Sequence, residues 1–434
     1  MREVQRLARL LGRLEERLTA CMRCGFCQAA CPLYAQTGRE SDVARGKLSL
    51  LKGLADQMLA DPLGVRERLE RCLLCGSCAA ACPSGVKVLD IFFEARAILG
   101  GYLGMGPAKQ LALRGLLSRP ALFDGLLEAA PLVQDLLTRP VNRGLDTARS
   151  RLPWPPGPRH FKRLASRPFH RRSRAASRPP AAGRPRVALF TGCLIDKLFP
   201  QVEEALWRVL EHHGVGVEAP AGQACCGLPA LAAGDVRAFG RLVAHNLERF
   251  DPGGFDYLLS ACPSCTMTLH KLWPLMAGEV EGVDRHRLGE LAAKARDASR
   301  FLVEAGLVEG PAPEPLPGAQ ILTYHDPCHL RKSLGVWTEP RRLLAANPAF
   351  RLVEMSQPDW CCGMGGGFNL AHYQLSAAMG RRKLADLAAT GAAVLATGCP
   401  ACMLQIGDAL SQAGSVTRVL HALEVYAQAL PVRP

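Results

Sequence analysis

The cysteines are the residues whose spacing in this sequence indicates chemistry. All 18 fall into four groups along the 434-residue chain, and none lies outside them. Thiols at short, repeated intervals in a long chain are typical of metal sites or redox catalysis. A chain of this length folds without disulfide bonds. The sequence therefore predicts several metal or redox centres.

The first two groups share one spacing. The run C-x2-C-x2-C-x3-C-P occupies residues 21–32 and again 72–83, with each cysteine 51 residues after its counterpart. Bacterial two-cluster ferredoxins have this spacing, and in them the fourth cysteine of each run binds the other [4Fe–4S] cluster. Zinc sites, the alternative, favour C-x2-C pairs with a longer gap. We therefore expect one cluster on Cys21, Cys24, Cys27 and Cys82, and a second on Cys72, Cys75, Cys78 and Cys31.

The other two groups form a second tandem repeat. Each holds a single cysteine, a Cys-Cys-Gly triplet and a C-x2-C pair, and equivalent cysteines lie 135 to 137 residues apart. Five thiolates exceed the four that a cubane needs, so either one cysteine is spare or the cofactor is not an ordinary cubane. The two groups are Cys193, Cys225, Cys226, Cys262 and Cys265, and Cys328, Cys361, Cys362, Cys399 and Cys402.

A few other residues near these groups are candidates for chemistry. His325 and His329 flank Cys328, where either a ligand or proton-relay role or simple packing beside a loop would explain them. The glycines at 365–367 lack the Lys-Ser/Thr of a phosphate-binding loop, and a close approach of backbone to cluster sulfides explains them better. His212 and His213 read as structural residues at a helix end.

The sequence contains no convincing site for an organic cofactor. No G-x-G-x-x-G follows a strand pattern, so we expect no bound nicotinamide or flavin. No acid–base constellation suited to a hydroxy acid is present either. We therefore assign no catalytic residue to this chain.

Strand and helix patterns indicate which elements position the second pair of groups. Strands are predicted at residues 186–190, 255–260, 319–325 and 392–398, with helical patterns between them. This alternation predicts α/β units with a mainly parallel sheet. The cysteines follow the strand ends, which is where ligands bind in open α/β sheets.

The predicted organisation is a helical dicluster ferredoxin-like domain followed by two tandem α/β domains, in an α+β and α/β fold class. The ferredoxin-like domain spans residues 1–98, and a helical connector spans 99–138. A basic linker rich in proline and arginine covers 139–185. The two cysteine-rich domains cover 186–310 and 311–434.

The net charge of +14 is concentrated in that linker. Residues 139–186 hold 14 arginines and lysines and one acid, Asp146. A solvated linker, or contact with an acidic partner or an anionic membrane face, explains the charge. Nucleic-acid binding is disfavoured because no reader motif accompanies it. With no signal peptide or apolar run of about 18 residues, we expect a cytoplasmic protein, with attachment to the inner membrane face as an option.

These motifs resemble a known family. CCGLP…CPSC and CCGMGGGF…CPAC resemble the CCG domains of heterodisulfide reductases and related oxidoreductase subunits. A double ferredoxin run before two CCG domains resembles the iron–sulfur subunit of glycolate oxidase and its D-lactate dehydrogenase relatives. It also resembles the D-type subunit of heterodisulfide reductase. The resemblance implies one or two noncubane [4Fe–4S] clusters on the five-cysteine groups, beside the two ferredoxin-type clusters.

Two functions follow from this resemblance. In the first, the chain is the electron-transfer subunit of a glycolate or D-lactate dehydrogenase, which passes electrons from a separate FAD subunit to a quinone or another carrier. In the second, it reduces a disulfide at noncubane clusters, as heterodisulfide reductases do. The ferredoxin portion favours the first function, and the complete set of ten CCG cysteines favours the second.

Overall fold

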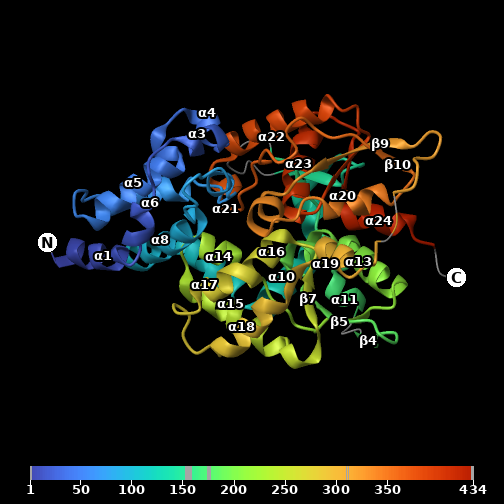
Figure 1. Ribbon diagram of the computed structural model, residues 1–434, viewed down its shortest axis with the longest axis horizontal. Coiled ribbons are helices and arrows are strands. Elements are labelled where there is room, and N and C mark those ends of the chain that lie inside the picture. The colour runs from blue at the N-terminus through green and yellow to red at the C-terminus, as the bar shows by residue number, and fades with distance from the viewer. Residues whose placement is uncertain (1, 152–158, 174–176, 309, 311, 432–434) are drawn as a thin grey trace.

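The computed structural model describes residues 2–151, 159–173, 177–308, 310 and 312–431 (Figure 1). Its N-terminal part is helical, as predicted. Helices pack around fully buried leucines and phenylalanines, among them Leu11, Leu51 and Phe93. The main helices are α1 (Arg2–Gly12), α2 (Glu15–Thr19), α5 (Ala44–Ala55), α6 (Pro62–Glu70) and α8 (Val88–Leu103).

Two sheets follow, and their common strand order makes the internal repeat visible. One sheet has the order β4-β6-β5-β7-β8 and the other β10-β9-β11-β12, so β6-β5-β7-β8 corresponds to β10-β9-β11-β12. All pairs within this common part are parallel, whereas β4 (Ser177–Arg178) joins antiparallel. The four central strands are β5 (Arg186–Leu189), β7 (Tyr257–Ser260), β9 (Gln320–His325) and β11 (Val394–Thr397).

The four central strands lie where the sequence predicts strands, but their neighbours were not predicted. These neighbours have three or four residues each, and none contains three consecutive apolar residues, so no apolar run marks them as the central strands are marked. They are β6 (Gly216–Glu218), β8 (Ala295–Asp297), β10 (Phe350–Leu352) and β12 (Arg418–His421).

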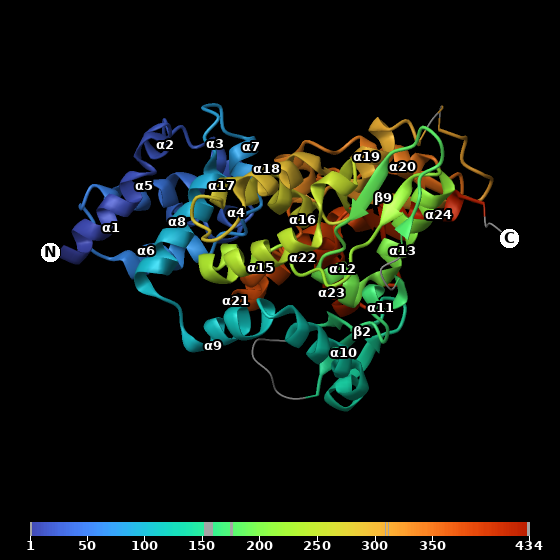
Figure 2. The ribbon, with the colours of Figure 1, turned by 90° about the horizontal axis from the view of Figure 1, so that it is seen from below.

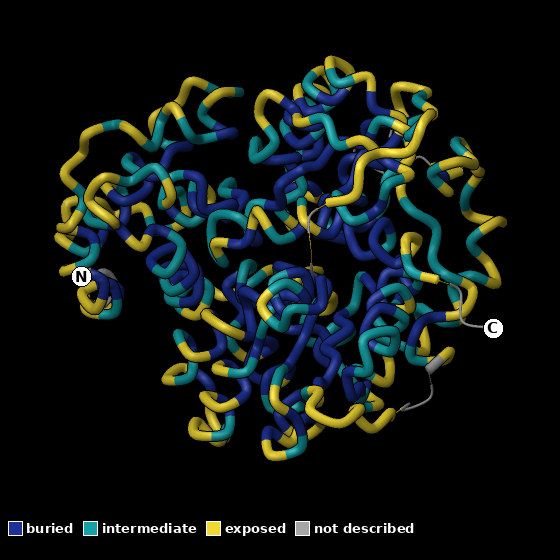
Figure 3. Tube along the Cα trace, turned by 45° about the vertical axis from the view of Figure 1, so that its right-hand side comes forward, coloured by how far each residue is buried: buried dark blue, intermediate teal, exposed yellow. Residues whose placement is uncertain are grey.

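Amphipathic helices cover the sheets and join the two units. In α13 (Pro200–His212), the buried residues recur at helical spacing, as at Val202, Leu206 and Val209. This helix packs against α24 (Ala422–Ala429) from the other unit. Buried residues consequently run through the centre of the molecule (Figure 3). The other long covering helices are α15 (Val236–Arg249), α22 (Tyr373–Ala388) and α23 (Pro400–Gln412).

The predicted connector and linker form ordered structure along one edge of the molecule (Figure 2). The connector contains α9 (Pro107–Gln110), η2 (Leu111–Leu117) and α10 (Pro120–Leu137). Within the described part of the linker, three short strands form an antiparallel sheet that packs on α23. They are β1 (Thr138–Asn142), β2 (Thr147–Ser150) and β3 (Phe161–Lys162), and α11 (Phe169–Ser173) follows. Residues 152–158 and 174–176 of the linker lie outside the described residues.

Several linker cations pair with acids of the same chain. Arg171 contacts Glu128 at 2.7 Å and Arg172 contacts Glu204 at 2.7 Å. Similar pairs join Lys162 to Asp146, Arg163 to Asp135 and Arg178 to Glu211. The local excess of positive charge is therefore partly neutralised within the fold. No helix among the described residues combines the length and apolar character needed to cross a membrane.

Candidate metal centres

The two ferredoxin-type runs adopt the same unusual backbone. Arg23 and Leu74 have φ of 59° and 56°, and Gly25 and Gly76 have φ of 88° and 75°. The glycines are the N-caps of α3 (Phe26–Ala30) and α7 (Ser77–Ala80). A left-handed conformation costs a non-glycine residue about 1–2 kcal/mol and concentrates at functional sites. The repeated loop therefore indicates a constraint shared by both runs.

The cysteines of the two runs line two small neighbouring cavities. Cys78 lines both cavities, which therefore lie side by side. The first is also lined by Cys21, Cys24, Cys27 and Cys82, and the second by Cys31, Cys72 and Cys75. The groups are those expected from the exchange of the fourth cysteine, and their soft sulfur donors suit iron–sulfur clusters. Which cysteine binds which cluster stays a prediction.

Buried cations surround the second of these cavities, and sequence reasoning missed them. Lys47 is 1% exposed and donates to the carbonyl oxygen of Asp42 at 2.5 Å. Arg96 donates to the carbonyl oxygen of Cys72 at 2.8 Å. Burial lowers the pKa of both side chains. The buried face of α5 includes Ala44, Leu48 and Lys47. A lysine at an apolar position of a helical pattern is the sequence feature that could have revealed the buried charge.

The cysteines of the second repeat lie at the carboxyl ends of the central strands. Cys193 begins α12 (Cys193–Leu198) after β5, and Cys262 caps α16 (Pro263–Met267) after β7. In the other unit, Cys328 precedes η5 (His329–Ser333) after β9, and Cys399 caps α23 after β11. Parallel strands thus bring residues distant in sequence to one sheet edge.

Within each unit the five thiols gather into one cluster. The sulfurs of Cys193 and Cys225 are 3.9 Å apart, and those of Cys362 and Cys402 are 3.5 Å apart. Contact with Cys225 lowers the pKa of Cys226, and contact with Cys361 lowers that of Cys362. Thiols this close suit a shared metal centre, because a metal binds them as thiolates and releases their protons.

Steric constraints explain why the third residue of each Cys-Cys-Gly triplet is glycine. Gly227 and Gly363 have φ of 95° and 96°. A Cβ at Gly227 would lie 2.6 Å from the ring of Phe239, and one at Gly363 would lie 2.6 Å from the carbonyl oxygen of Ser376. Only glycine fits both the backbone and the space.

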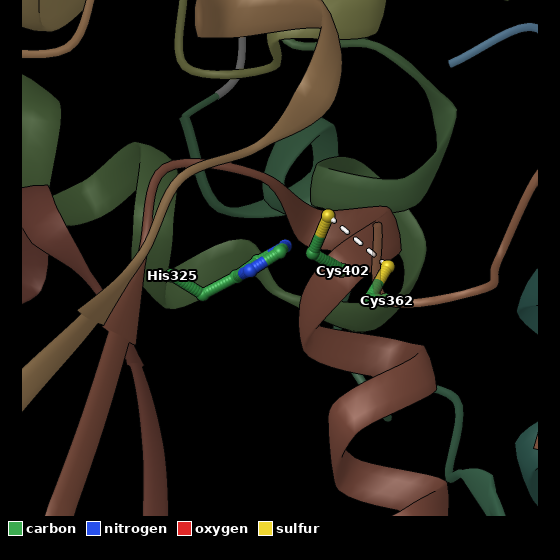
Figure 4. Close-up of side chains that lie close together, drawn as sticks. All are labelled: His325, Cys362 and Cys402. Carbon is green, nitrogen blue, oxygen red and sulfur yellow. Dashed lines mark hydrogen bonds between the residues drawn. The ribbon is translucent and has the colours of Figure 1, made fainter. Parts of the chain in front are cut away.

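The two histidines beside Cys328 differ in their surroundings. His329 contacts the carbonyl oxygen of Leu74 through Nε2 and the hydroxyl of Ser264 through Nδ1, each at 3.0 Å, so it joins three parts of the chain. His325 contacts the Pro358 carbonyl oxygen through Nδ1 at 3.1 Å, and its ring points toward the two sulfurs in Figure 4. The ligand atoms of His325, Cys362 and Cys402 lie within 4.8 Å of one another. His325 is therefore the histidine placed to act on the centre.

The glycine run and the partly buried Lys332 lie where the ferredoxin-like part meets the second α/β unit. A Cβ at Gly365 would lie 3.1 Å from the Cα of Leu73, so the close approach there is to a ferredoxin-type loop. Lys332 donates to the Ser77 hydroxyl at 2.7 Å and to the Asp359 carbonyl oxygen at 2.8 Å. These contacts hold the loop of Cys75 against the second unit.

The four cysteine groups form one continuous series of thiols. Cys75 of the second ferredoxin-type run directly contacts Cys361 of the second α/β unit. Cys399 of that unit directly contacts Cys262 of the first unit. We call this the thiol series: the ferredoxin-type cavities, then the group containing Cys328, then the group containing Cys193. Its order in space differs from the order in sequence, which no local pattern could reveal.

Family models match both parts of the chain. A 4Fe-4S dicluster domain matches residues 17–86. A cysteine-rich domain matches twice, at residues 187–270 and 322–407. These ranges contain all of the cysteines described above.

Three relatives match this chain, two over nearly its whole length and one over about half of it. The chain is 29% identical over 432 residues to a probable glycolate oxidase iron-sulfur subunit of Bacillus subtilis, covering 96% of this chain and 94% of the relative. It is 32% identical over 244 residues to lactate utilization protein A of Exiguobacterium sp., covering 56% of this chain and 96% of the relative. It is 27% identical over 437 residues to the D-type subunit of a heterodisulfide reductase from Methanosarcina barkeri, covering 95% and 94%.

Proposed function

The chain belongs to the family of cysteine-rich iron–sulfur subunits that includes lactate utilization protein A and the glycolate oxidase iron-sulfur subunits, and from this premise we propose that it transfers electrons within a 2-hydroxy-acid dehydrogenase. A separate FAD subunit would oxidise glycolate or D-lactate, because a two-electron acceptor must take the hydride. A quinone or another carrier would receive the electrons.

The continuous thiol series carries this proposal. Electron transfer along a chain needs centres close to one another. Here Cys78 lines both ferredoxin-type cavities, Cys75 contacts Cys361, and Cys399 contacts Cys262. Iron–sulfur clusters supply one-electron steps when bound at such thiols. Buried Lys47 and partly buried Lys332 lie beside the series, where positive charge stabilises thiolates.

The proposed ligand sets follow the groups of thiols. Cys21, Cys24, Cys27 and Cys82 would bind one [4Fe–4S] cluster, and Cys31, Cys72, Cys75 and Cys78 another. The two groups of five would bind noncubane [4Fe–4S] clusters. The shared cavities and the short sulfur–sulfur distances support these sets.

Iron analysis of anaerobically purified protein tests this proposal. Four clusters predict about 16 iron and 16 sulfide per chain. Electron paramagnetic resonance (EPR) spectra of the reduced and oxidised protein should then contain signals beyond those of two cubanes. About 8 iron per chain, with ferredoxin-type signals alone, would restrict the electron path to the N-terminal part.

One contact favours disulfide reduction as a second candidate function. Because Cys262 contacts Cys399, the two complete groups of five face each other, and a disulfide placed between them would present one sulfur to each. Turnover of a small organic disulfide by the reduced chain alone would support this function. If instead the clusters of this chain are reduced by a flavoprotein and a 2-hydroxy acid, and the disulfide is not turned over, the first function is supported.

A further inference from the structure

A cavity of about 610 Å³ lies at the far end of the thiol series, beside Cys193 and Cys225. Its other walls come from α10, α11 and the loop at residues 219–224. Cavities of this size hold small organic molecules.

One wall is a connected network of acids and bases. His170 contacts Glu128 through Nε2 at 2.6 Å and Asp196 through Nδ1 at 2.9 Å. Lys197, whose side chain is 4% exposed, contacts both Asp196 and Asp124 at 2.8 Å. The hydrogen bond to Asp196 raises the pKa of His170, which favours its protonated form. The network can therefore hold a proton beside the cavity and replace it from solvent.

The charges of this wall balance. Asp124, Glu128 and Asp196 oppose Lys197, His170 and Arg171, so no excess positive charge awaits a phosphate or carboxylate. A metal ion would have to compete with the amine and imidazole for those carboxylates. The lining also includes Phe123, Phe169 and Pro220. Balanced charge and apolar rings suit a neutral planar molecule.

Exposed apolar residues on α10 indicate how such a molecule would reach the cavity. Leu122 and Leu126 are 46% and 51% exposed on the same helix whose residues Phe123, Gly125 and Glu128 line the cavity. Helix α10 thus contributes both an exposed apolar surface and a wall of the cavity. A lipid-soluble ligand would partition to that surface before it enters.

We propose that this cavity binds a quinone. This inference rests on the proposed function, which supplies the electrons. A quinone takes up two electrons and two protons to give the hydroquinone, and both carbonyl oxygens become hydroxyls. His170 gives the two protons one at a time, and solvent reprotonates it after each transfer while Glu128 and Asp196 hold its ring in place.

A cavity-filling variant tests the site. Gly125→Trp places an indole in the cavity from a helical position where a Cβ meets no atom within 4 Å. Gly101→Trp is the matched control, because Gly101 is also an exposed helical glycine with free space and does not line the cavity. The full-length protein, purified anaerobically, is equilibrated with a short-chain benzoquinone, and bound quinone and iron content are measured separately.

We expect one quinone per chain for wild type and Gly101→Trp, and binding at least ~10-fold weaker for Gly125→Trp at unchanged iron content. If Gly125→Trp loses iron, Ala221→Trp fills the cavity from the loop at residues 219–224. Equal binding by all variants overturns the proposal, as does a small organic disulfide that displaces the quinone. Normal iron content without quinone binding would overturn this site and leave the electron-transfer proposal standing.

Discussion

At the scale of single residues, the two α/β units differ at one position beside their thiols. His325 in the second unit corresponds to Phe190 in the first, because each lies three residues before the first cysteine of its group. Phe190 is buried against Phe250, whereas His325 directs its ring at Cys362 and Cys402. The repeat has therefore kept its cysteines while changing the polarity next to them. Two centres with identical cysteines need not have the same reduction potential.

The variant His325→Phe tests that difference. Because Nδ1 donates to the Pro358 carbonyl oxygen, the imidazolium form of His325 directs its second nitrogen–hydrogen group, on Nε2, at the sulfurs and stabilises the added negative charge of a reduced centre. Losing a hydrogen bond of about 1.4 kcal/mol should lower the potential of this centre by about 60 mV. Redox titration monitored by EPR measures the shift. The ferredoxin-type signals in the same sample are the control, and a shift of all signals together would contradict a local effect of His325.

The buried carboxyl group of Glu203 predicts how the stability of the fold depends on pH. This side chain is completely buried and accepts a hydrogen bond from Thr191, and burial raises its pKa to about 8. Because the folded state holds this proton to a higher pH than the unfolded state does, stability should fall as pH rises from about 4.5 to 8. The slope from this group reaches about 1.4 kcal/mol per pH unit.

Thermal unfolding of Glu203→Gln at pH 6 and pH 8 measures that contribution. The amide keeps the acceptor for Thr191 and removes the ionisation, so the variant should lose less stability between the two values than wild type. Glu290→Gln, on the exposed face of α18 (Arg285–Lys294), is the control and should keep the wild-type pH slope. An unchanged slope in Glu203→Gln would mean that Glu203 does not ionise in this range.

At the scale of elements, the triplet glycines fix how each Cys-Cys pair turns into the following chain. Gly227 and Gly363 have almost the same φ, although they face a phenylalanine ring in one unit and a carbonyl oxygen in the other. The backbone requirement is therefore common to the repeat, and the packing partner is not. The turn belongs to the site itself rather than to its surroundings.

Gly363→Ala should destabilise the second unit by about 2–4 kcal/mol, because it adds left-handed strain to a clash with backbone. Gly289→Ala, in the exposed helix α18, meets no atom within 4 Å and should instead stabilise by up to about 1 kcal/mol. Denaturant unfolding of both variants gives the comparison. Equal effects would show that the loop relaxes around the new methyl group.

The same scale shows what could be predicted from the sequence. Cysteine spacing identified both repeats, and apolar runs located the central strands β5, β7, β9 and β11. The short strands β6 and β10 could not be predicted, because three residues with no continuous apolar run show no recognisable strand pattern. The contacts Cys75–Cys361 and Cys262–Cys399 could not be predicted either, because each joins residues more than 130 positions apart. Only the packing of whole units brings such residues together.

At the scale of the whole molecule, the order of the thiol series makes the second unit the bridge. The ferredoxin-type run contacts Cys361, and the group containing Cys193 is reached only beyond the Cys399–Cys262 contact. His329 and Lys332 tie this bridge to the ferredoxin-like part through Leu74 and Ser77. A chain that ran in sequence order would place the first unit there instead. The cavity beside Cys193 would then lie in the middle of the path rather than at its end.

This order predicts which α/β unit holds the centre that couples magnetically to the ferredoxin-type clusters. Paramagnetic centres enhance the relaxation of near neighbours, so the ferredoxin-type signals should be broadened by a centre in the second unit. The double variant Cys399→Ser/Cys402→Ser should remove that broadening. The equivalent pair in the first unit, Cys262→Ser/Cys265→Ser, is the matched control and should leave it, because Cys262 joins the series through Cys399, on the side away from the ferredoxin-type runs. Relaxation measurements on the reduced proteins decide the matter, since loss of broadening in the control alone would reverse the order and move the end of the path away from the cavity.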